Sequence, residues 1–241
     1  SALVVGVGLW IRLRLPEPEV FEAARTETER ELPIKAVFRE HWATILKVVV
    51  LGLFSVVSTI YAAFAMAYAG QLGLPRSVML QAVILTASLS LVVQPFAGIL
   101  ADRIGRKPVF IAGNLVCSVA VFAVFWSIST RNVPLIFLSS ILLMTVGYGL
   151  VNPLGPPMVA ELFPTRIRYS GGATASQLGL VATGFAPTIA AAVIRPGPTG
   201  WVPVAVLTAV CCLASAAVVL FGLRENYRTP TEELGLRPET A

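Results

Sequence analysis

The sequence has few charged residues, and long stretches of the chain have none at all. Of its 241 residues, 13% are charged and 56% are hydrophobic, and the mean hydropathy is +0.80. A soluble globule of this size needs more polar surface than this composition supplies. The scarcity of charge therefore excludes a soluble domain and predicts a membrane protein.

Histidine and cysteine are also scarce. His41 is the single histidine, which excludes a multi-histidine metal cluster within this chain. Cys117, Cys211 and Cys212 fall inside apolar stretches, where a free cysteine behaves as a small hydrophobe and supports neither a disulfide framework nor a metal site. No acids are paired inside the apolar stretches either, so a catalytic set is missing. We expect no metal, no cofactor and no enzyme activity. The sequence therefore gives little support to the alternative of an intramembrane enzyme.

Six stretches free of charge are each long enough to cross a hydrocarbon layer of about 30 Å as a helix. The loops between them are very short, so successive helices are antiparallel neighbours. The sequence therefore predicts an all-α membrane protein with a six-helix bundle over residues 48-223. The expected helices span 48-71, 78-101, 108-129, 133-160, 169-194 and 201-223.

The segments outside the bundle are of three kinds. Residues 1-11 are apolar but too short to span. No basic n-region or cleavage site makes them a signal peptide, so we interpret them as the end of a preceding helix. Residues 12-47 hold seven basic and seven acidic residues and predict a cytoplasmic central loop, ending in an interfacial helix over 34-45. Residues 224-241 predict a polar, disordered cytoplasmic tail.

Basic residues are concentrated on one side of the predicted bundle. Fifteen of the 18 lie in segments on that side, and only Arg76, Arg131 and Arg195 lie on the other. Because cytoplasmic loops carry an excess of lysine and arginine, we expect a multi-pass protein of the cell (inner or plasma) membrane with both ends of this chain cytoplasmic. The net charge of +5 follows from this topology. No basic groove or aromatic interleaving predicts nucleic-acid binding, so the lipid bilayer is the expected partner.

A short charged segment, residues 98-107, separates two of the uncharged stretches and reads G-x-x-x-D-R-x-G-R-K. We expect a tight turn in which Gly98 lets helices approach and Gly105 takes a positive φ. The basic residues would hold this turn at a cytoplasmic face, and a generic positive-inside loop is the alternative interpretation. The fixed positions are Gly98, Asp102, Arg103, Gly105, Arg106 and Lys107.

This motif resembles the signature of the major facilitator superfamily. A second motif, E-x-x-P-x-x-x-R from Glu161 to Arg168, is similar to one in its sugar-porter-like branch. Residues 37-42, 160-171 and 177-179 resemble the metabolite:proton symporter family in particular. The resemblance implies a twelve-helix fold of two six-helix halves, of which this chain is the C-terminal half and the end of helix six.

The resemblance also implies a function and a set of interacting charges. The function is secondary active transport of a small metabolite by alternating access, with proton coupling. The implied charge network, which includes Arg166 and Arg168, pairs Glu161 with Arg106 and sets Asp102 against a helix of the N-terminal half. No carboxylate lies inside the six stretches, so we expect the proton-carrying residue in that other half. A drug or metabolite efflux member and a non-transporting fragment remain the alternatives.

Polar side chains within the spans are the candidates for contact with substrate, and we select Tyr61, Tyr148, Asn152 and Gln177. Asn152 lies in a span where residues 147-157 hold three prolines and three glycines, which predicts a kink. The kink fits either a structural accommodation or a gate helix that lines a cavity. The next span repeats small residues every four positions, which predicts a packing face. These residues are Gly171, Ala175, Gly179 and Thr183.

Overall fold

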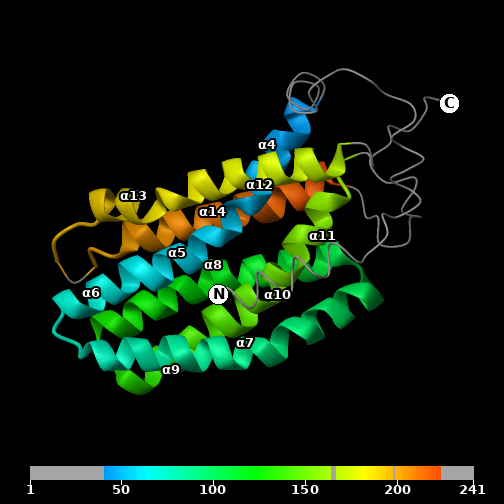
Figure 1. Ribbon diagram of the computed structural model, residues 1–241. Helices are drawn as coiled ribbons and strands as arrows, with labels where there is room; N and C mark the ends of the chain where they lie inside the picture. The colour runs from blue at the N-terminus through cyan, green and yellow to red at the C-terminus, as the bar shows by residue number, and fades with distance from the viewer. Residues whose placement is uncertain (1–40, 164–166, 198, 224–241) are drawn as a thin grey trace, which may run out of the picture.

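Six antiparallel helices long and apolar enough to cross a membrane make up the part of the chain that the structure describes (Figure 1). This structure is a computed structural model, and it describes residues 41–163, 167–197 and 199–223. The predicted all-α six-helix fold is confirmed. The expected helix end at 1-11, most of the central loop and the tail at 224-241 lie outside the described residues.

Five of the six spans lie within a few residues of their expected ranges, and three spans are built from more than one piece. The first comprises α4 (Trp42–Leu51), η1 (Gly52–Ser55), α5 (Val56–Thr59), η2 (Ile60–Ala65) and α6 (Met66–Gln71). The second and third are α7 (Arg76–Ile104) and α8 (Arg106–Ser129). The fourth comprises α9 (Val133–Ser140), η3 (Ile141–Tyr148), α10 (Gly149–Val151), η4 (Asn152–Leu154) and α11 (Gly155–Ala160). The last two are α12 (Arg168–Gly184) with α13 (Ala186–Val193), and α14 (Val202–Gly222).

Prolines account for two of the irregular places in the spans. The η1 and η4 segments are 3₁₀ turns, and η2 and η3 are π-helical. The η4 turn contains Pro153, which has no amide hydrogen to continue an α-helical ladder. The fifth span breaks at Phe185, two residues before Pro187. The predicted distortion of the fourth span is therefore present as a 3₁₀ turn between two α-helical pieces.

The first span begins at Trp42, six residues earlier than the sequence predicts. Lys47 made the earlier residues look like a loop, because a charge is costly within a span. Its Nζ donates a hydrogen bond to the Gly222 carbonyl at the end of α14, at 2.9 Å. The charge is therefore satisfied at the end of the bundle, and the helix continues past it.

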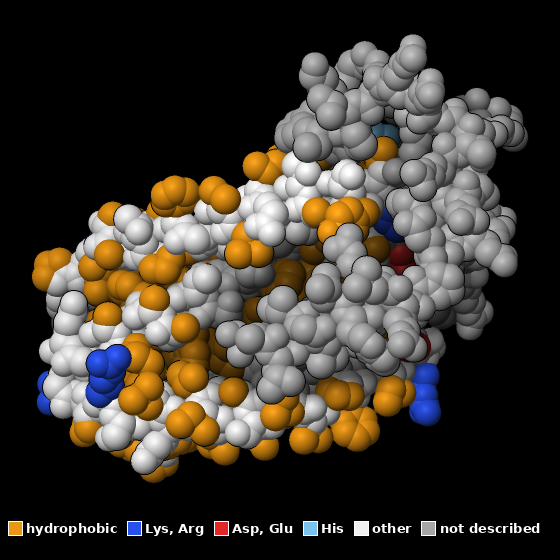
Figure 2. Space-filling model, viewed as in Figure 1, with side chains coloured by type: hydrophobic (Ala, Val, Ile, Leu, Met, Phe, Trp, Pro, Cys, Tyr) orange, Lys and Arg blue, Asp and Glu red, His pale blue; other side chains and the backbone are white. Residues whose placement is uncertain are grey.

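Charged side chains gather at the two ends of the bundle, and hydrophobic side chains cover its length (Figure 2). One end carries the turns before α7, α9 and α14. The other end carries the turn between α7 and α8, where Gly105 has a φ of 99° as expected for that glycine. The long helices are thus closed by short polar turns outside the apolar layer.

The core is centred on α8, which packs against α14 and η3. Phe110, Phe125 and Ile128 of α8 are fully buried. By contrast, only 11% of the most apolar stretch of α7 is buried, and 22% of that of the fifth span, α12 with α13. These two spans therefore form the faces of the bundle that lipid or another protein must cover.

Two glycines bring α8 and the fourth span into contact at backbone distance. A Cβ added at Gly147 would lie 2.6 Å from Cys117 Sγ and 3.1 Å from its amide nitrogen. A Cβ added at Gly113 would lie 2.9 Å from the Gly147 carbonyl oxygen. Side chains larger than hydrogen therefore do not fit at this crossing.

We expect Gly147→Ala to destabilise the bundle by about 1–3 kcal/mol, because overpacking forces neighbouring side chains and backbone apart. Thermal unfolding of the purified protein in detergent measures the loss. Gly70→Ala is the control, since a Cβ at that helical position meets no atom within 4 Å. Equal melting temperatures for the two variants would contradict the tight crossing.

Candidate functional site

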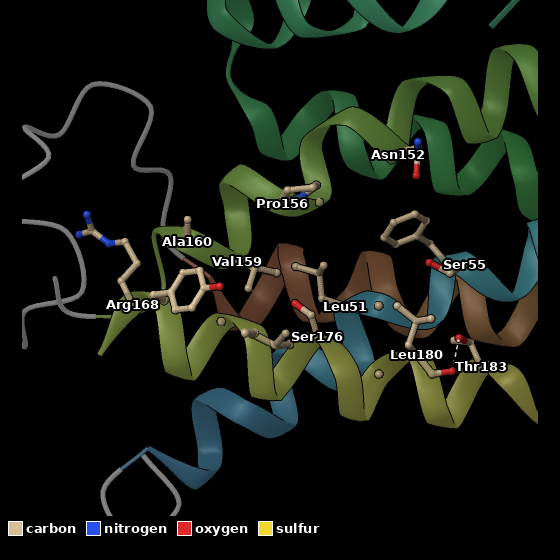
Figure 3. Close-up of a pocket in the computed structure, with 18 residues that line it drawn as sticks. Leu51, Ser55, Asn152, Pro156, Val159, Ala160, Arg168, Ser176, Leu180 and Thr183 are labelled. Atoms are coloured by element: carbon tan, nitrogen blue, oxygen red, sulfur yellow. Dashed lines mark hydrogen bonds between the residues drawn. The ribbon is translucent and has the colours of Figure 1, made fainter. Parts of the chain in front are cut away.

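A cavity of about 680 Å³ lies between the first, fourth and fifth spans (Figure 3). Its walls come from α4 and η1, from η4 and α11, and from α12. Leu51, Val159 and Leu180 supply apolar surface. Its size fits a small organic molecule, since pockets for such ligands measure about 300–1,000 Å³.

Small residues and broken helices make room for this cavity. Gly52 of η1 and Gly179 of α12 meet closely, with an added Cβ on Gly52 only 3.9 Å from the Gly179 Cα. Gly155 lies beside the Phe54 ring, and Gly172 has only one side chain within reach. The backbone therefore approaches the cavity directly where side chains would otherwise fill it.

Besides Tyr169, four uncharged polar side chains line this space, and they come from three different spans. Asn152 and Ser55 project from facing helices, and Ser176 and Thr183 lie along α12 (Figure 3). The Thr183 hydroxyl donates to the Leu180 carbonyl at 3.1 Å, which leaves its oxygen able to accept. Hydroxyl and amide groups on an apolar wall can orient a polar ligand by hydrogen bonds.

Ionisable groups contribute little to the cavity. No acidic residue is among the described residues that line it. Arg168 stands at its end, where its Nε donates to the Phe163 carbonyl at 3.2 Å and its guanidinium is directed away from the cavity (Figure 3). The arrangement suits binding by neutral hydrogen bonds, and no group of three or more potential metal ligands occurs among the described residues.

The four residues selected from the sequence lie in different places. Asn152 lines the cavity. Tyr148 packs beside it, with its ring 5.8 Å from that of Phe54. Tyr61 is 2% exposed in a separate part of the core, and Gln177 is exposed on α12; neither is among the residues that line the cavity.

Sequence reasoning missed the hydroxyl residues of the cavity. Ser55 and Ser176 gave no signal, because single serines in apolar helices usually bond their own backbone. Thr183 was assigned to the packing face of α12 together with Gly171, Ala175 and Gly179. All four are buried, so the packing face is confirmed, and Gly179 and Thr183 line the cavity as well.

The charged residues of the turn between α7 and α8 take two different sets of partners. Arg106 forms an ion pair with Glu161, and their side chains are 22% and 17% exposed. Lys107 instead donates to carbonyls of α14, at 2.7 Å to Leu223 and 3.3 Å to Leu220. Together with Lys47, it thus occupies the carbonyl end of α14, where positive charge is favoured.

Three other predicted positions have less defined surroundings. Asp102 and Arg103 are exposed. A Cβ added at Gly98 would meet no atom within 4 Å, so the close helix approach expected there does not occur among the described residues. Arg166 lies outside the described residues.

Comparison with known proteins gives one matching family model and several relatives that are named as transport proteins. A family model described as Major Facilitator Superfamily matches residues 48–240. A shikimate transporter of Escherichia coli strain K12 is 33% identical over 232 residues, which cover 94% of this chain and 52% of that protein. An inner membrane metabolite transport protein of the same strain is 31% identical over 207 residues, which cover 79% and 45%. A proline/betaine transporter of that strain is 34% identical over 101 residues, 42% of this chain and 20% of that protein.

The chain spans about half the length of the shikimate and inner membrane metabolite transport proteins. The described bundle has six spans, and in two of them, the second and the fifth, most of the apolar stretch is not buried.

We expect Lys107→Met to lower the stability of the bundle by about 1.5–3 kcal/mol, the contribution typical of hydrogen bonds to a charged group. The variant leaves the carbonyls of Leu220 and Leu223 without this donor. Thermal unfolding in detergent checks it, with Arg103→Met as the control on an exposed cation of the same turn. A smaller loss for Lys107→Met than for Arg103→Met would contradict the capping role.

Proposed function

This chain belongs to the major facilitator superfamily, and on that premise we propose that it is the C-terminal half of a secondary active transporter for a small polar metabolite. The observation that carries the proposal is the cavity walled by Ser55, Asn152 and Ser176. It has walls from three spans of one bundle and needs a second bundle to complete it. Two bundles that rock about such a site give alternating access.

The relatives support the class of cargo. One is named a shikimate transporter and another a proline/betaine transporter. We propose a cargo of similar size that hydrogen-bonds to the hydroxyls and the amide of the cavity. Uptake is the proposed direction, and a drug or metabolite efflux activity is the alternative.

Proton coupling is the proposed energy source. No carboxylate is among the residues that line the cavity, and the six uncharged sequence stretches contain none. We therefore propose that the group that binds the proton lies in the N-terminal half. The distribution of basic residues supports a cytoplasmic location for the end of the bundle that holds Arg106 and Glu161.

The proposal is tested by uptake into liposomes that contain the intact transporter and carry an imposed proton gradient. Labelled shikimate, proline and glycine betaine are the probes. Asn152→Ala and Ser176→Ala should each raise the KM for the transported probe about twofold to tenfold, because each removes a hydrogen bond worth about 0.5–1.5 kcal/mol.

Ser118→Ala is the matched control for Ser176→Ala. Ser118 is buried in α8, outside the cavity, and donates to the Leu115 carbonyl of its own helix. An unchanged KM in both cavity variants would contradict this site. If the gradient drives accumulation of none of the three probes, the proposed cargo class is wrong.

The ion pair between Arg106 and Glu161 is proposed to act with Asp102 as a latch that favours the outward-facing state. Glu161→Gln removes an interaction that is largely shielded from water. We expect Glu161→Gln and Asp102→Asn to insert normally but to slow transport about fivefold, which corresponds to a bias of about 1 kcal/mol. Accessibility of single engineered cysteines should shift toward the inward-open state.

A purely topological role for this turn needs its positive charges but neither acid. Wild-type turnover and accessibility in both variants would therefore leave only that role. Reduced insertion of either variant would also count against the latch.

A further inference from the structure

Two buried hydroxyls meet where the first and fourth spans pack together. Tyr61 lies in the π-helical η2, and Ser140 ends α9 just before the π-helical η3. Tyr61 is 2% exposed and Ser140 is fully buried. Within the described residues, neither the Tyr61 hydroxyl nor the Ser140 Oγ has a hydrogen-bond partner.

A third hydroxyl completes the cluster. The Tyr61 hydroxyl is a neighbour of both Ser140 and Thr86 of α7, although the contacts do not have the geometry of hydrogen bonds. Thr86 Oγ1 donates to the Val83 carbonyl at 3.0 Å, so its oxygen can still accept. The cluster therefore holds two hydroxyls, those of Tyr61 and Ser140, that can donate a hydrogen bond but have no acceptor in the described part of the chain. The Thr86 oxygen can still accept one.

Other polar groups nearby are already engaged. Ser139 donates to carbonyls of its own helix and pairs with Ser127 at 3.0 Å. Thr145 Oγ1 donates to the Thr86 carbonyl at 3.2 Å. In hydrocarbon surroundings an unsatisfied hydroxyl is costly, so two of them side by side need an explanation.

We propose that one ordered water molecule is bound among the hydroxyls of Tyr61, Ser140 and Thr86. The water accepts hydrogen bonds from Tyr61 and Ser140 and donates one to Thr86. Three hydrogen bonds is the usual number for a buried water that satisfies buried polar groups. A cation fits less well, because the three oxygens are neutral and a buried charge needs a counter-charge.

This water joins three spans at one level of the bundle. Tyr61 belongs to the first span and Ser140 to the fourth, and both spans line the cavity further along, at η1 and η4. The site lies where the first and fourth spans become π-helical, a distortion often found at functional sites. The proposal concerns hydration of the core and stands apart from the cargo and direction of transport.

Radiolytic footprinting by X-rays, read by mass spectrometry, tests the site in the intact protein. X-rays split a bound water where it lies, and the radicals label the adjacent aromatic ring. We expect Tyr61 to be labelled at least fivefold faster than Phe125, which is 1% exposed and packs against aromatic rings. Equal labelling rates at Tyr61 and Phe125 would overturn the proposal. A direct hydrogen bond between the hydroxyls, with no water between them, would give the same equal rates and would also overturn it.

A scavenger in the bulk solvent separates bound water from solvent that enters the core. It should quench labelling at Tyr169, which is 88% exposed, but not at Tyr61. Quenching at both positions would show that bulk solvent reaches Tyr61, and the proposal would fail. A change in Tyr61 labelling when choline replaces sodium would show that a cation occupies the site. That result would also overturn the proposal of a bound water.

Ser140→Val removes a donor and fills the volume of the water, so it should reduce labelling at Tyr61 to the level of Phe125. Ser118→Val is the matched control in α8 and should leave Tyr61 labelling unchanged. Loss of labelling in both variants would contradict a local site. The comparison of Tyr61 with Phe125 in the unmodified protein decides the question if Ser140→Val fails to fold.

Discussion

Water is absent from the hydrocarbon layer, so each backbone polar group of this bundle needs a partner within the protein. Regular helices meet that need by themselves, and the structure departs from them at few places. At one such place, beside the 3₁₀ turn η1, the Ser215 hydroxyl of α14 donates to the Leu51 carbonyl at 2.5 Å. A distant span thus supplies the bond that lets the first span bend beside the cavity.

The same constraint accounts for the charged end of the bundle. The last carbonyls of α14 have no amides of their own helix to accept from. Lys47 and Lys107, from the first and third spans, donate to them instead. Lys47, which the sequence predicts in a loop, therefore connects the first span to the sixth. Lys107, from the charged motif, connects the third span to the same end of the sixth. Arg106 is left to pair with Glu161 of the fourth span.

The sequence predicted the spans well and the site poorly, for physical reasons. Absence of charge over a long stretch is a local property, so five of the six helices fell close to their observed bounds. The positive φ of Gly105 and the packing face of α12 are also local. The cavity depends on which faces of three spans meet, so Ser55 and Ser176 gave no signal. The partner of Lys107 lies more than a hundred residues away along the chain, and the start at Trp42 was missed because Lys47 finds a distant carbonyl.

Two segments of irregular backbone lie beside the cavity, and their position bears on which spans of the bundle can move. The 3₁₀ turns η1 and η4 line the cavity, whereas the central helix α8 is regular and has many buried residues. A regular helix in a dense core resists deformation, because each displaced side chain needs new space. The first and fourth spans already depart from regular α-helix, and one carbonyl in each, those of Leu51 and Leu143, accepts a hydrogen bond from the side chain of another span. We therefore expect motion of the bundle to involve these two spans, which line the cavity, more than α8.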